Sequence, residues 1–431
     1  MCLYPRGGGT GAKVGKSVEM CKGGRTKFSA SVERAGGIFF VPSRGKKEVF
    51  LARMIARILP LLALLLLLPA WAVDRKELRP RRVRGWVRWS LWLPPLVLLA
   101  LLSVTALSES YTPQADLWKG RLLTLTLLAG VPLAVYALLL PLRRRAVRLV
   151  GALCVLLALL YGFTLGWRQL EVRRIDVPCA TLPPAFAGYR IVHLSDLHLG
   201  TLRGHADVVA RLVDSVNAQQ PDLIALTGDL VNYHPEELLD FVPQLSRLRA
   251  RDGIVSVMGN HDYMGYHRWP GPADSLAAVR RLQEAQRAMG WHLLLNENYL
   301  VRRGADSMAV IGLENDGPPR FPALADLTKA RRGLTPGCFE VFLQHDPSYW
   351  RRMSPSAPLM LAGHTHGMQL RLLGWSPAAW FYPEWGGLYE QSAAPSSDPA
   401  RLYVSQGFGS VLLPFRLGAW PEFTVITLRT H

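Results

Sequence analysis

Two histidines one residue apart, His364 and His366, stand between glycines in the stretch from Gly363 to Gly367. The apolar run 358–362 directly precedes them and predicts a buried strand. A strand that ends in this way would present both imidazoles at the carboxyl edge of a sheet, which is where ligand sites lie in open α/β sheets. The spacing alone fits both a metal site and a surface pair, so other segments must decide between them.

Residue types that bind metals also follow four other predicted strands in the same half of the chain. These strands cover residues 189–194, 222–227, 254–258 and 339–343. The candidate ligands at the five strand ends are Asp196, His198, Asp229, Asn260, His345, His364 and His366. Carboxylate, amide and imidazole groups without a thiolate suit Mn, Fe or Zn ions. A carboxylate on a tight Gly-Asp turn, such as that of Asp229, can bridge two ions that together clamp a phosphoryl group.

Helices are predicted between these strands. Residues 204–219 place Val208, Leu212 and Val216 on one face, and residues 235–248 and 273–289 are two further helices. Strands that alternate with helices predict a largely parallel sheet covered by helices. Short runs at 292–295, 299–303, 308–313, 402–404 and 423–428 provide strands for a second sheet.

The first 167 residues differ in composition from the rest. They hold 25 of the 50 Lys and Arg residues but 7 of the 32 Asp and Glu residues, whereas all 11 histidines lie after residue 168. Apolar stretches of about 20 residues, long enough to cross a hydrocarbon layer of ~30 Å, occupy residues 54–73, 89–107, 122–142 and 149–167. We therefore predict an all-α transmembrane segment followed by an α/β domain.

The predicted organisation has four parts. They are a disordered basic tail (1–53), four transmembrane helices (54–167), a linker (168–188) and the α/β domain (189–431). Met54 is an alternative start of the chain. Basic residues beside apolar runs set membrane orientation. The excess positive charge lies in the first 167 residues, whereas a nucleic-acid-binding groove would need it on the folded α/β domain. A lipid bilayer is therefore the expected partner, and nucleic acid is not.

The loops between the apolar stretches predict the orientation of the chain. The first loop carries Lys and Arg residues throughout 75–88, the third carries four within 143–148, and the second has only Lys119 and Arg121. Positively charged loops stay in the cytoplasm, so the α/β domain is expected on the outer, periplasmic or extracellular, face of the cytoplasmic (inner) membrane. The basic tail, if native, favours the opposite orientation.

The strand ends, taken together, resemble the calcineurin-like metallophosphoesterases from about Arg190 to Leu428. The motifs that carry the resemblance are Asp196-x-His198, Gly228-Asp229, Gly259-Asn260-His261-Asp262, His345 and Gly363-His364-x-His366. The resemblance implies a two-sheet αββα sandwich, two divalent metal ions, manganese among the candidates, and hydrolysis of phosphoric ester or anhydride bonds.

The family's pattern also implies a role for each matching residue. Asp196, His198 and His366 would hold one ion, Asn260, His345 and His364 would hold the other, and Asp229 would bridge them. His261 is the implied proton donor to the leaving oxygen, and Asp262 is expected to orient it.

Within this family the chain is similar to a bacterial membrane-associated branch. The closer likeness rests on Ser195-Asp196-Leu197-His198, Gly407-Phe408-Gly409, and Arg416 followed by Pro421-Glu422. Relatives there include a membrane-bound UDP-2,3-diacylglucosamine pyrophosphohydrolase of lipid A biosynthesis, which implies a phosphorylated lipid or nucleotide-linked substrate. Met368 stands where that branch tends to have glycine. In addition, the UDP-linked lipid is cytoplasmic, whereas the domain is expected to face outward. Both observations argue against assigning the relative's substrate to this chain.

Residues near the motifs suggest substrate contacts. Tyr263 belongs to an aromatic stretch after the third motif, and Arg416 is a candidate phosphate clamp whose alternative is an exposed loop arginine. A second aromatic stretch, 375–385, either faces lipid beside the site or forms a satellite core.

Two other classes of function remain open. One is a membrane scaffold or transporter-like protein with a regulatory phosphoesterase domain, and the other is a non-catalytic metal-binding module. The apolar stretches contain no Asp, Glu, Lys or His in their interiors, which argues against transport. The complete set of ligands and the proton donor argue against a module without activity.

Overall fold

The computed structural model describes residues 50–107, 113–267, 269–317, 321–353, 358–391 and 398–430. Residues 1–49 of the predicted basic tail lie outside these described ranges, so the prediction of disorder is not addressed by them.

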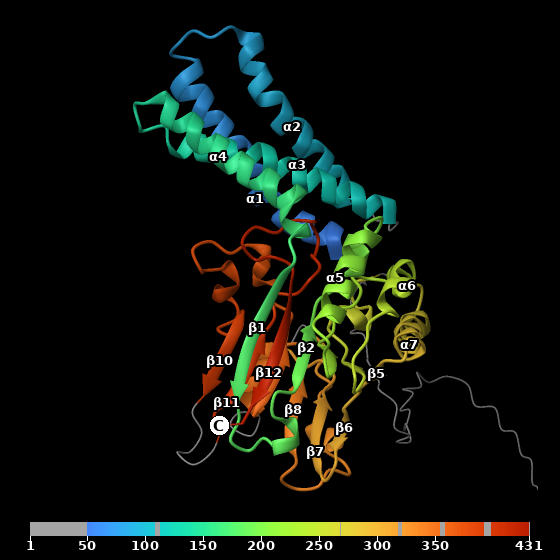
Figure 1. Ribbon diagram of the computed structural model, residues 1–431. Coiled ribbons are helices and arrows are strands. Elements are labelled where there is room, and N and C mark those ends of the chain that lie inside the picture. Colours follow the sequence, from blue (N-terminus) through green and yellow to red (C-terminus); the bar gives the residue numbers. More distant parts are fainter. Residues whose placement is uncertain are drawn as a thin grey trace, which may run out of the picture. The chain divides into compact units, whose positions relative to one another are not determined.

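Four apolar helices open the described chain (Figure 1). They are α1 (Phe50–Val73), α2 (Gly85–Leu107), α3 (Pro113–Leu138) and α4 (Arg145–Thr164). All four are long and apolar enough to cross a membrane, and they leave large side chains such as Leu61, Trp89 and Val104 more than half exposed. The predicted helical membrane segment is confirmed, although α1 begins a few residues before the predicted start.

The first and third loops lie at the same end of the helix bundle. Arg148 Nη1 lies 2.6 Å from Glu77 Oε1, and the hydroxyl of Tyr136 donates a hydrogen bond of 2.7 Å to the same carboxylate. Arg88 forms an ion pair of 2.6 Å with Asp74 at this end. These pairs explain how acidic side chains are accommodated among the basic loop residues.

Two six-stranded sheets follow the helices. The first sheet has the order β1 (Glu171–Pro178), β12 (Glu422–Arg429), β2 (Arg190–Leu194), β3 (Leu223–Leu226), β4 (Ile254–Ser256) and β5 (His292–Leu293). The second has the order β10 (Gly387–Gln391), β11 (Ala400–Val404), β9 (Leu359–Ala362), β8 (Phe339–Leu343), β7 (Asp306–Gly312) and β6 (Glu297–Arg303). Strands β2 to β5 are parallel, as are β11, β9, β8 and β7.

Helices cover the outer faces of the two sheets, and an apolar core lies between the sheets. α5 (Ala206–Ala218), α6 (Val242–Leu245) and α7 (Pro272–Ala288) pack on the first sheet (Figure 1). α8 (Leu327–Ala330) and α9 (Trp350–Met353) contribute to a separate core with the second. Between the sheets lie side chains of both, among them Ile191, Leu223, Val255, Val310 and Val341. This arrangement confirms the predicted two-sheet αββα sandwich.

The structure corrects two details of the sequence analysis. Residues 171–178, assigned to a linker, form the edge strand β1, which pairs in parallel with β12 along its whole length. Charged residues at this exposed edge conceal the strand signal. The predicted helix 235–248 is instead a 3₁₀ segment (Pro235–Phe241) followed by the short α6, because the second proline of the run, Pro243, has no amide hydrogen to continue the first helix.

Candidate metal centre

All five predicted ligand segments meet at one edge of the sandwich. They follow the carboxyl ends of β2, β3, β4, β8 and β9. Backbone hydrogen bonds join neighbouring segments within each sheet: the amide of Asp196 donates to Gly228 at 3.0 Å, and the amide of Gly363 donates to His345 at 3.0 Å. Between the sheets, the amide of His364 donates to the Asp196 carboxylate at 3.1 Å. The ligand side chains are therefore placed by the strands and by the turns that end them.

Close backbone approach at this edge requires glycine at two positions. Gly228 has φ +93°, and a Cβ atom there would overlap the backbone of Gly259. A Cβ atom on Gly363 would overlap Ser195 and the Asp196 carboxylate. Several ligands, Asp229 among them, also have left-handed backbone angles. Such strain persists only where the surrounding structure imposes it, which is common at functional sites.

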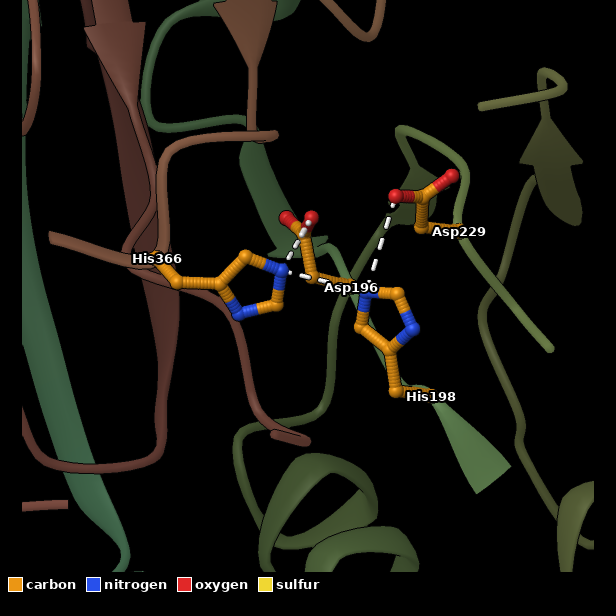
Figure 2. A group of neighbouring side chains, drawn as sticks. All are labelled: Asp196, His198, Asp229 and His366. Atoms are coloured by element: carbon orange, nitrogen blue, oxygen red, sulfur yellow. Dashed lines mark hydrogen bonds and ion pairs between the residues drawn. The ribbon is translucent and has the colours of Figure 1, made fainter. Parts of the chain in front are cut away.

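The first cluster of ligand atoms contains Asp196, His198, Asp229 and His366, all buried (Figure 2). The Nε2 atoms of His198 and His366 lie 3.1 Å apart. Nε2 of His366 is 3.1 Å from Oδ1 of Asp196, and Nε2 of His198 is 3.5 Å from Oδ2 of Asp229. Two imidazole nitrogens and two carboxylates thus point into one small volume.

The second cluster contains Asp229, His345 and His364, and Asn260 adjoins it. Nε2 of His345 is 3.1 Å from Oδ2 of Asp229 and 3.3 Å from Nδ1 of His364. Oδ1 of Asn260 is 2.8 Å from the same Nδ1 atom. Because Asp229 belongs to both clusters, its carboxylate lies between two groups of donors.

Hydrogen bonds on the far sides of the rings orient two of these histidines. Nδ1 of His345 is 2.7 Å from the carbonyl oxygen of Thr227, and Nε2 of His364 is 2.7 Å from the hydroxyl of Tyr382. If these nitrogens carry the ring protons, the lone pairs of His345 Nε2 and His364 Nδ1 face the cluster. Such outer hydrogen bonds are characteristic of histidines that bind metals.

A relay of hydroxyl groups supports Asp196 from behind. Nε2 of the buried His193 is 2.8 Å from the Thr227 hydroxyl, which donates to Ser195 at 2.8 Å. The Ser195 hydroxyl in turn donates to the Asp196 carboxylate. Burial lowers the pKa of His193 to about 3, so its ring is neutral and a single ring proton fixes the direction of the relay.

Electrostatics in the centre favour a cation. Burial would raise the pKa of Asp229, but His345 and His261 outweigh it and hold that pKa well below its usual range. Burial would lower the pKa of His345, but the carboxylates of Asp229 and Asp196 raise it to about 10. The buried Asp229 carboxylate and the His345 imidazole, 3.1 Å apart, therefore each stabilise the charged form of the other.

The donor set fits divalent metal ions. The rings of His198 and His366 are neutral at neutral pH because burial lowers the pKa of each. Their two Nε2 atoms face each other beside the buried carboxylate of Asp196. A cation between them would satisfy both nitrogen lone pairs and both neighbouring carboxylates, which matches the oxygen and nitrogen chemistry of Mn, Fe or Zn sites.

His261 lies beside the first cluster. Its ring centroid is 4.9 Å from that of His198, and its Nδ1 atom is 2.7 Å from the carbonyl oxygen of Asn232. The carboxylate of Asp262, which was expected to orient the ring, instead accepts hydrogen bonds from the backbone amides of Gly259 and Leu230. Asn232 therefore orients the ring, and Asp262 holds the two ligand turns together.

Sequence reasoning did not single out two tyrosines at the centre, Tyr266 and Tyr382. The predicted substrate contact Tyr263 donates its hydroxyl to Glu314 at 3.2 Å. Tyr266 instead stacks on His261 with centroids 4.1 Å apart and accepts a hydrogen bond of 2.7 Å from Asn260. The hydroxyl of Tyr382, 18 residues after His364, lies within hydrogen-bonding distance of that ring. Tyr266 and Tyr382 lie within the two aromatic stretches of the sequence, but packing and not spacing determines which ring contacts a ligand.

Arg416 has no exposed surface, which excludes the expected exposed loop arginine. Its guanidinium donates to the carbonyl oxygens of Gly409 and Ala419, at 2.9 Å for Nε and Nη1 respectively. Nη2 lies 3.3 Å from Nδ1 of His366, and burial lowers the pKa of this arginine to about 10. The guanidinium thus supports the loop behind His366 and is occupied by protein acceptors.

The calcineurin-like phosphoesterase model matches residues 189–368, a range that contains all seven candidate ligands and His261. This part of the chain is a calcineurin-like phosphoesterase domain. It is a hydrolase domain for phosphoester bonds, and its family uses divalent metals.

Relatives of the phosphoesterase domain include membrane proteins. The chain is 28% identical over 281 residues to the uncharacterized metallophosphoesterase YkuE of Bacillus subtilis, covering 63% of this chain and 90% of that protein. It is 31% identical over 268 residues to a transmembrane protein with metallophosphoesterase domain from Bos taurus, covering 60% of this chain and 57% of that protein. The match thus spans less than two thirds of the bovine relative.

One solved structure aligns with about half of this chain. It is that of a phosphopantetheinyl hydrolase from Mycobacterium tuberculosis, which aligns with a TM-score of 0.32 at 14% identity and covers 51% of this chain and 89% of that one.

Proposed function

We propose that the chain is a membrane-anchored phosphoesterase that binds two divalent ions and hydrolyses a phosphodiester, phosphomonoester or pyrophosphate bond. Asp196, His198 and His366 would hold one ion, Asn260, His345 and His364 the other, and Asp229 would bridge them. The observation that carries this proposal is the position of the Asp229 carboxylate, 3.5 Å from His198 in one cluster and 3.1 Å from His345 in the other.

The ions would supply positive charge for the phosphoryl oxygens and lower the pKa of a bound water. The protein supplies the proton for the leaving oxygen. Burial lowers the pKa of His261 to about 4, although the Asp229 carboxylate opposes this shift, so the free ring is neutral with its proton on Nδ1, facing Asn232. The negative charge of a bound phosphate ester would stabilise the imidazolium form, and Nε2 could then protonate the leaving group.

The substrate proposed is lipid-linked or nucleotide-linked. Membrane anchoring by four apolar helices supports a lipid-linked compound, of which UDP-2,3-diacylglucosamine is one candidate. The basic first and third loops, gathered at one end of the helix bundle, support an outer-face phosphoesterase domain in a cytoplasmic membrane. An outward-facing domain would exclude a UDP-lipid, because such precursors are cytoplasmic, and would favour an envelope phospholipid or a polyprenyl-type phosphate.

Hydrolysis of bis(4-nitrophenyl) phosphate by the purified full chain tests the activity. Metal-free protein is loaded separately with Mn²⁺, Fe²⁺ or Zn²⁺, and bound metal is counted by mass spectrometry. We expect two ions per chain and turnover that requires them. A chain that binds both ions and hydrolyses neither this diester, nor 4-nitrophenyl phosphate, nor the pyrophosphate bond of a nucleotide sugar would overturn the proposal. A reporter active on one side of the membrane, fused after Thr430, tests the orientation.

A further inference from the structure

A group of exposed apolar side chains follows the last two candidate ligands. We call residues 368–381 the apolar loop. Its exposed members are Met368 (49% exposed), Leu372 (55%), Leu373 (107%), Trp375 (46%), Trp380 (74%) and Phe381 (65%). The rings of Trp375 and Trp380 lie 5.0 Å apart, so these two exposed side chains form one apolar surface. Contiguous apolar surface of this kind marks an interaction site, whereas single exposed apolar residues are normal.

A tight backbone turn exposes the side chain at the tip of the apolar loop. Leu372 and Trp375 exchange two backbone hydrogen bonds, of 2.8 and 3.0 Å, around the tight turn Leu373-Gly374. Both turn residues have positive φ, +50° and +83°, which is unfavourable for leucine. A leucine with a fully exposed side chain at the tip of such a turn is explained if the tip enters an apolar environment.

Hydrogen bonds fix the base of the apolar loop to a second loop, residues 411–417. The amide of Arg371 donates to Leu417 at 2.8 Å, and the amide of Leu417 donates to Gln369 at 3.0 Å. The side chain of Gln369 accepts from the amide of Val411 at 2.6 Å and donates to Phe415 at 3.0 Å. The two loops therefore form one unit.

The second loop packs among the ends of the four candidate membrane spans. Leu413 belongs to a buried cluster with Ile55, Leu102 and Leu123 of three helices. The ring of Phe415 lies 4.8 Å from that of Phe163 at the end of α4. This places the second loop, and with it the base of the apolar loop, at the level where the spans end.

Side chains typical of a membrane interface also lie at the ends of the candidate membrane spans. Trp118, 60% exposed, lies at the start of the third candidate span, and the guanidinium of Arg121 lies 5.0 Å from its ring. Tryptophan rings and arginine side chains gather at the boundary between headgroups and acyl chains. The exposed tryptophans of the apolar loop have the chemistry of that boundary.

Residues of the metal centre flank the apolar loop at both ends. Met368 is two residues after the ligand His366, and the hydroxyl of Tyr382, next to Phe381, lies 2.7 Å from the ligand His364. A surface that enters the bilayer here would bring the centre to the level of lipid phosphates.

We propose that the apolar loop inserts into the bilayer interface and that the metal centre takes a phosphate ester or anhydride whose acyl chains remain in that leaflet. This inference rests on the proposed phosphoesterase function and names its substrate class. The occupant of the apolar surface is the phospholipid bilayer itself, because the loop is continuous with the membrane end of the helix bundle.

Photocrosslinking tests the contact without requiring activity. The full chain, carrying p-benzoylphenylalanine at Leu373, is placed in phosphatidylcholine nanodiscs and irradiated. The matched control carries the same group at Leu276, another exposed leucine (46%) on α7. We expect lipid adducts at Leu373 about tenfold above those at Leu276, by mass spectrometry of the peptides. Equal adduct levels at the two positions would overturn the proposal.

Competition tests the source of the substrate. Hydrolysis of bis(4-nitrophenyl) phosphate is measured in nanodiscs with and without phosphatidic acid, and separately with inorganic phosphate. In the unmodified chain, phosphatidic acid should raise the apparent KM about tenfold, equivalent to ~1.4 kcal/mol. The double variant Leu373→Asp, Trp380→Asp should show a rise of at most about twofold, while inorganic phosphate still inhibits it, which reports an intact centre.

The outcomes separate the two proposals. If the double variant and the unmodified chain respond equally to phosphatidic acid, or if only inorganic phosphate inhibits the unmodified chain, the lipid inference is wrong although the phosphoesterase function stands. If the metal-loaded unmodified chain hydrolyses neither a phosphate ester nor a pyrophosphate bond, the proposed function fails. Crosslinking still decides whether the apolar loop contacts lipid.

Discussion

The Nε2 atoms of His198 and His366 lie 3.1 Å apart, although 168 residues separate them in the sequence. His198 follows β2 of the first sheet and His366 follows β9 of the second, so this contact spans the carboxyl edges of both. Burial lowers the pKa of both rings, which leaves nitrogen lone pairs available at neutral pH. The fold itself therefore brings the donor atoms together.

Replacement of the shared carboxylate tests the division of the centre into two clusters. Asp229→Asn keeps the size of the side chain but removes the negative charge from between His198 and His345. We expect the variant to bind fewer than two ions and to lose at least ~100-fold in turnover, more than the usual effect of changing an outer partner of a metal ligand. Metal counting and hydrolysis of bis(4-nitrophenyl) phosphate measure both effects.

Asp240→Asn is the matched control for Asp229→Asn, because the Asp240 side chain is 60% exposed and belongs to neither cluster. It should retain both ions and its activity. Full activity and full metal content in Asp229→Asn would disprove the bridging position.

The role of His261 as proton donor is tested by varying the leaving group. His261→Ala should retain both ions but lose ~10²–10⁴-fold in turnover of an alkyl phosphodiester, whose leaving oxygen needs a proton. The loss should be smaller with 4-nitrophenolate, which leaves readily as an anion. His292→Ala, which removes an exposed imidazole, is the control. An equal loss for both leaving groups would assign His261 a structural role.

The ligand turns could be predicted from sequence because each is local: an apolar strand followed by Gly-Asp or Gly-Asn-His is visible within a few residues. The partners of the ligands could not. The carbonyl of Asn232 orients His261, and Tyr266 stacks on it, through packing that no spacing encodes. Arg416 could not be placed either, because its burial depends on a loop that packs behind His366.

Edge strands were hidden for a related reason. β1 and β10 carry charged residues on their exposed sides, so their periodicity is weak. β1 forms by pairing with β12, which is distant in sequence, and β10 forms by pairing with β11, from which a loop separates it. Central strands such as β8 and β9 are almost entirely buried and largely apolar, and they were predicted to within one residue of their observed bounds.

Gly228→Ala tests the close approach of the ligand turns. The added Cβ would overlap the backbone of Gly259 and would force alanine into φ +93°. The left-handed backbone alone costs ~1–2 kcal/mol, and the overlap adds to this by displacing the turn that carries Asn260. We expect lower thermal stability and loss of bound metal, measured on the same samples.

Gly188→Ala is the control for Gly228→Ala. Gly188 also has positive φ (+79°), but nothing lies within 4 Å of its added Cβ. This variant should lose stability through backbone strain and keep its metal ions. If both variants lose stability equally and both keep their metal, the contact between the turns does not position the ligands.

Glu237 makes the stability of the phosphoesterase domain depend on pH at a distance from the ligands. Its carboxylate accepts hydrogen bonds from the backbone amides of Asn232 and Tyr233, and so holds the segment whose carbonyl orients His261. Burial nevertheless raises the pKa of Glu237 from 4.5 to about 7. The folded state therefore binds the proton more tightly than the unfolded state does.

The sign of the pH dependence follows from this raised pKa. The protonated carboxyl contributes full stability below pH 4.5, and the contribution falls as the pH rises towards 7, by ~3 kcal/mol in total. Glu237→Gln, which cannot ionise, should lose this dependence and become more stable relative to the unmodified chain as the pH rises. Chemical denaturation of both proteins across this range measures the difference. Glu236→Gln, which changes an exposed neighbour, is the control and should leave the pH profile unchanged. If the pH profile of Glu237→Gln runs parallel to that of the unmodified chain, Glu237 has an ordinary pKa in the folded state and the prediction is wrong.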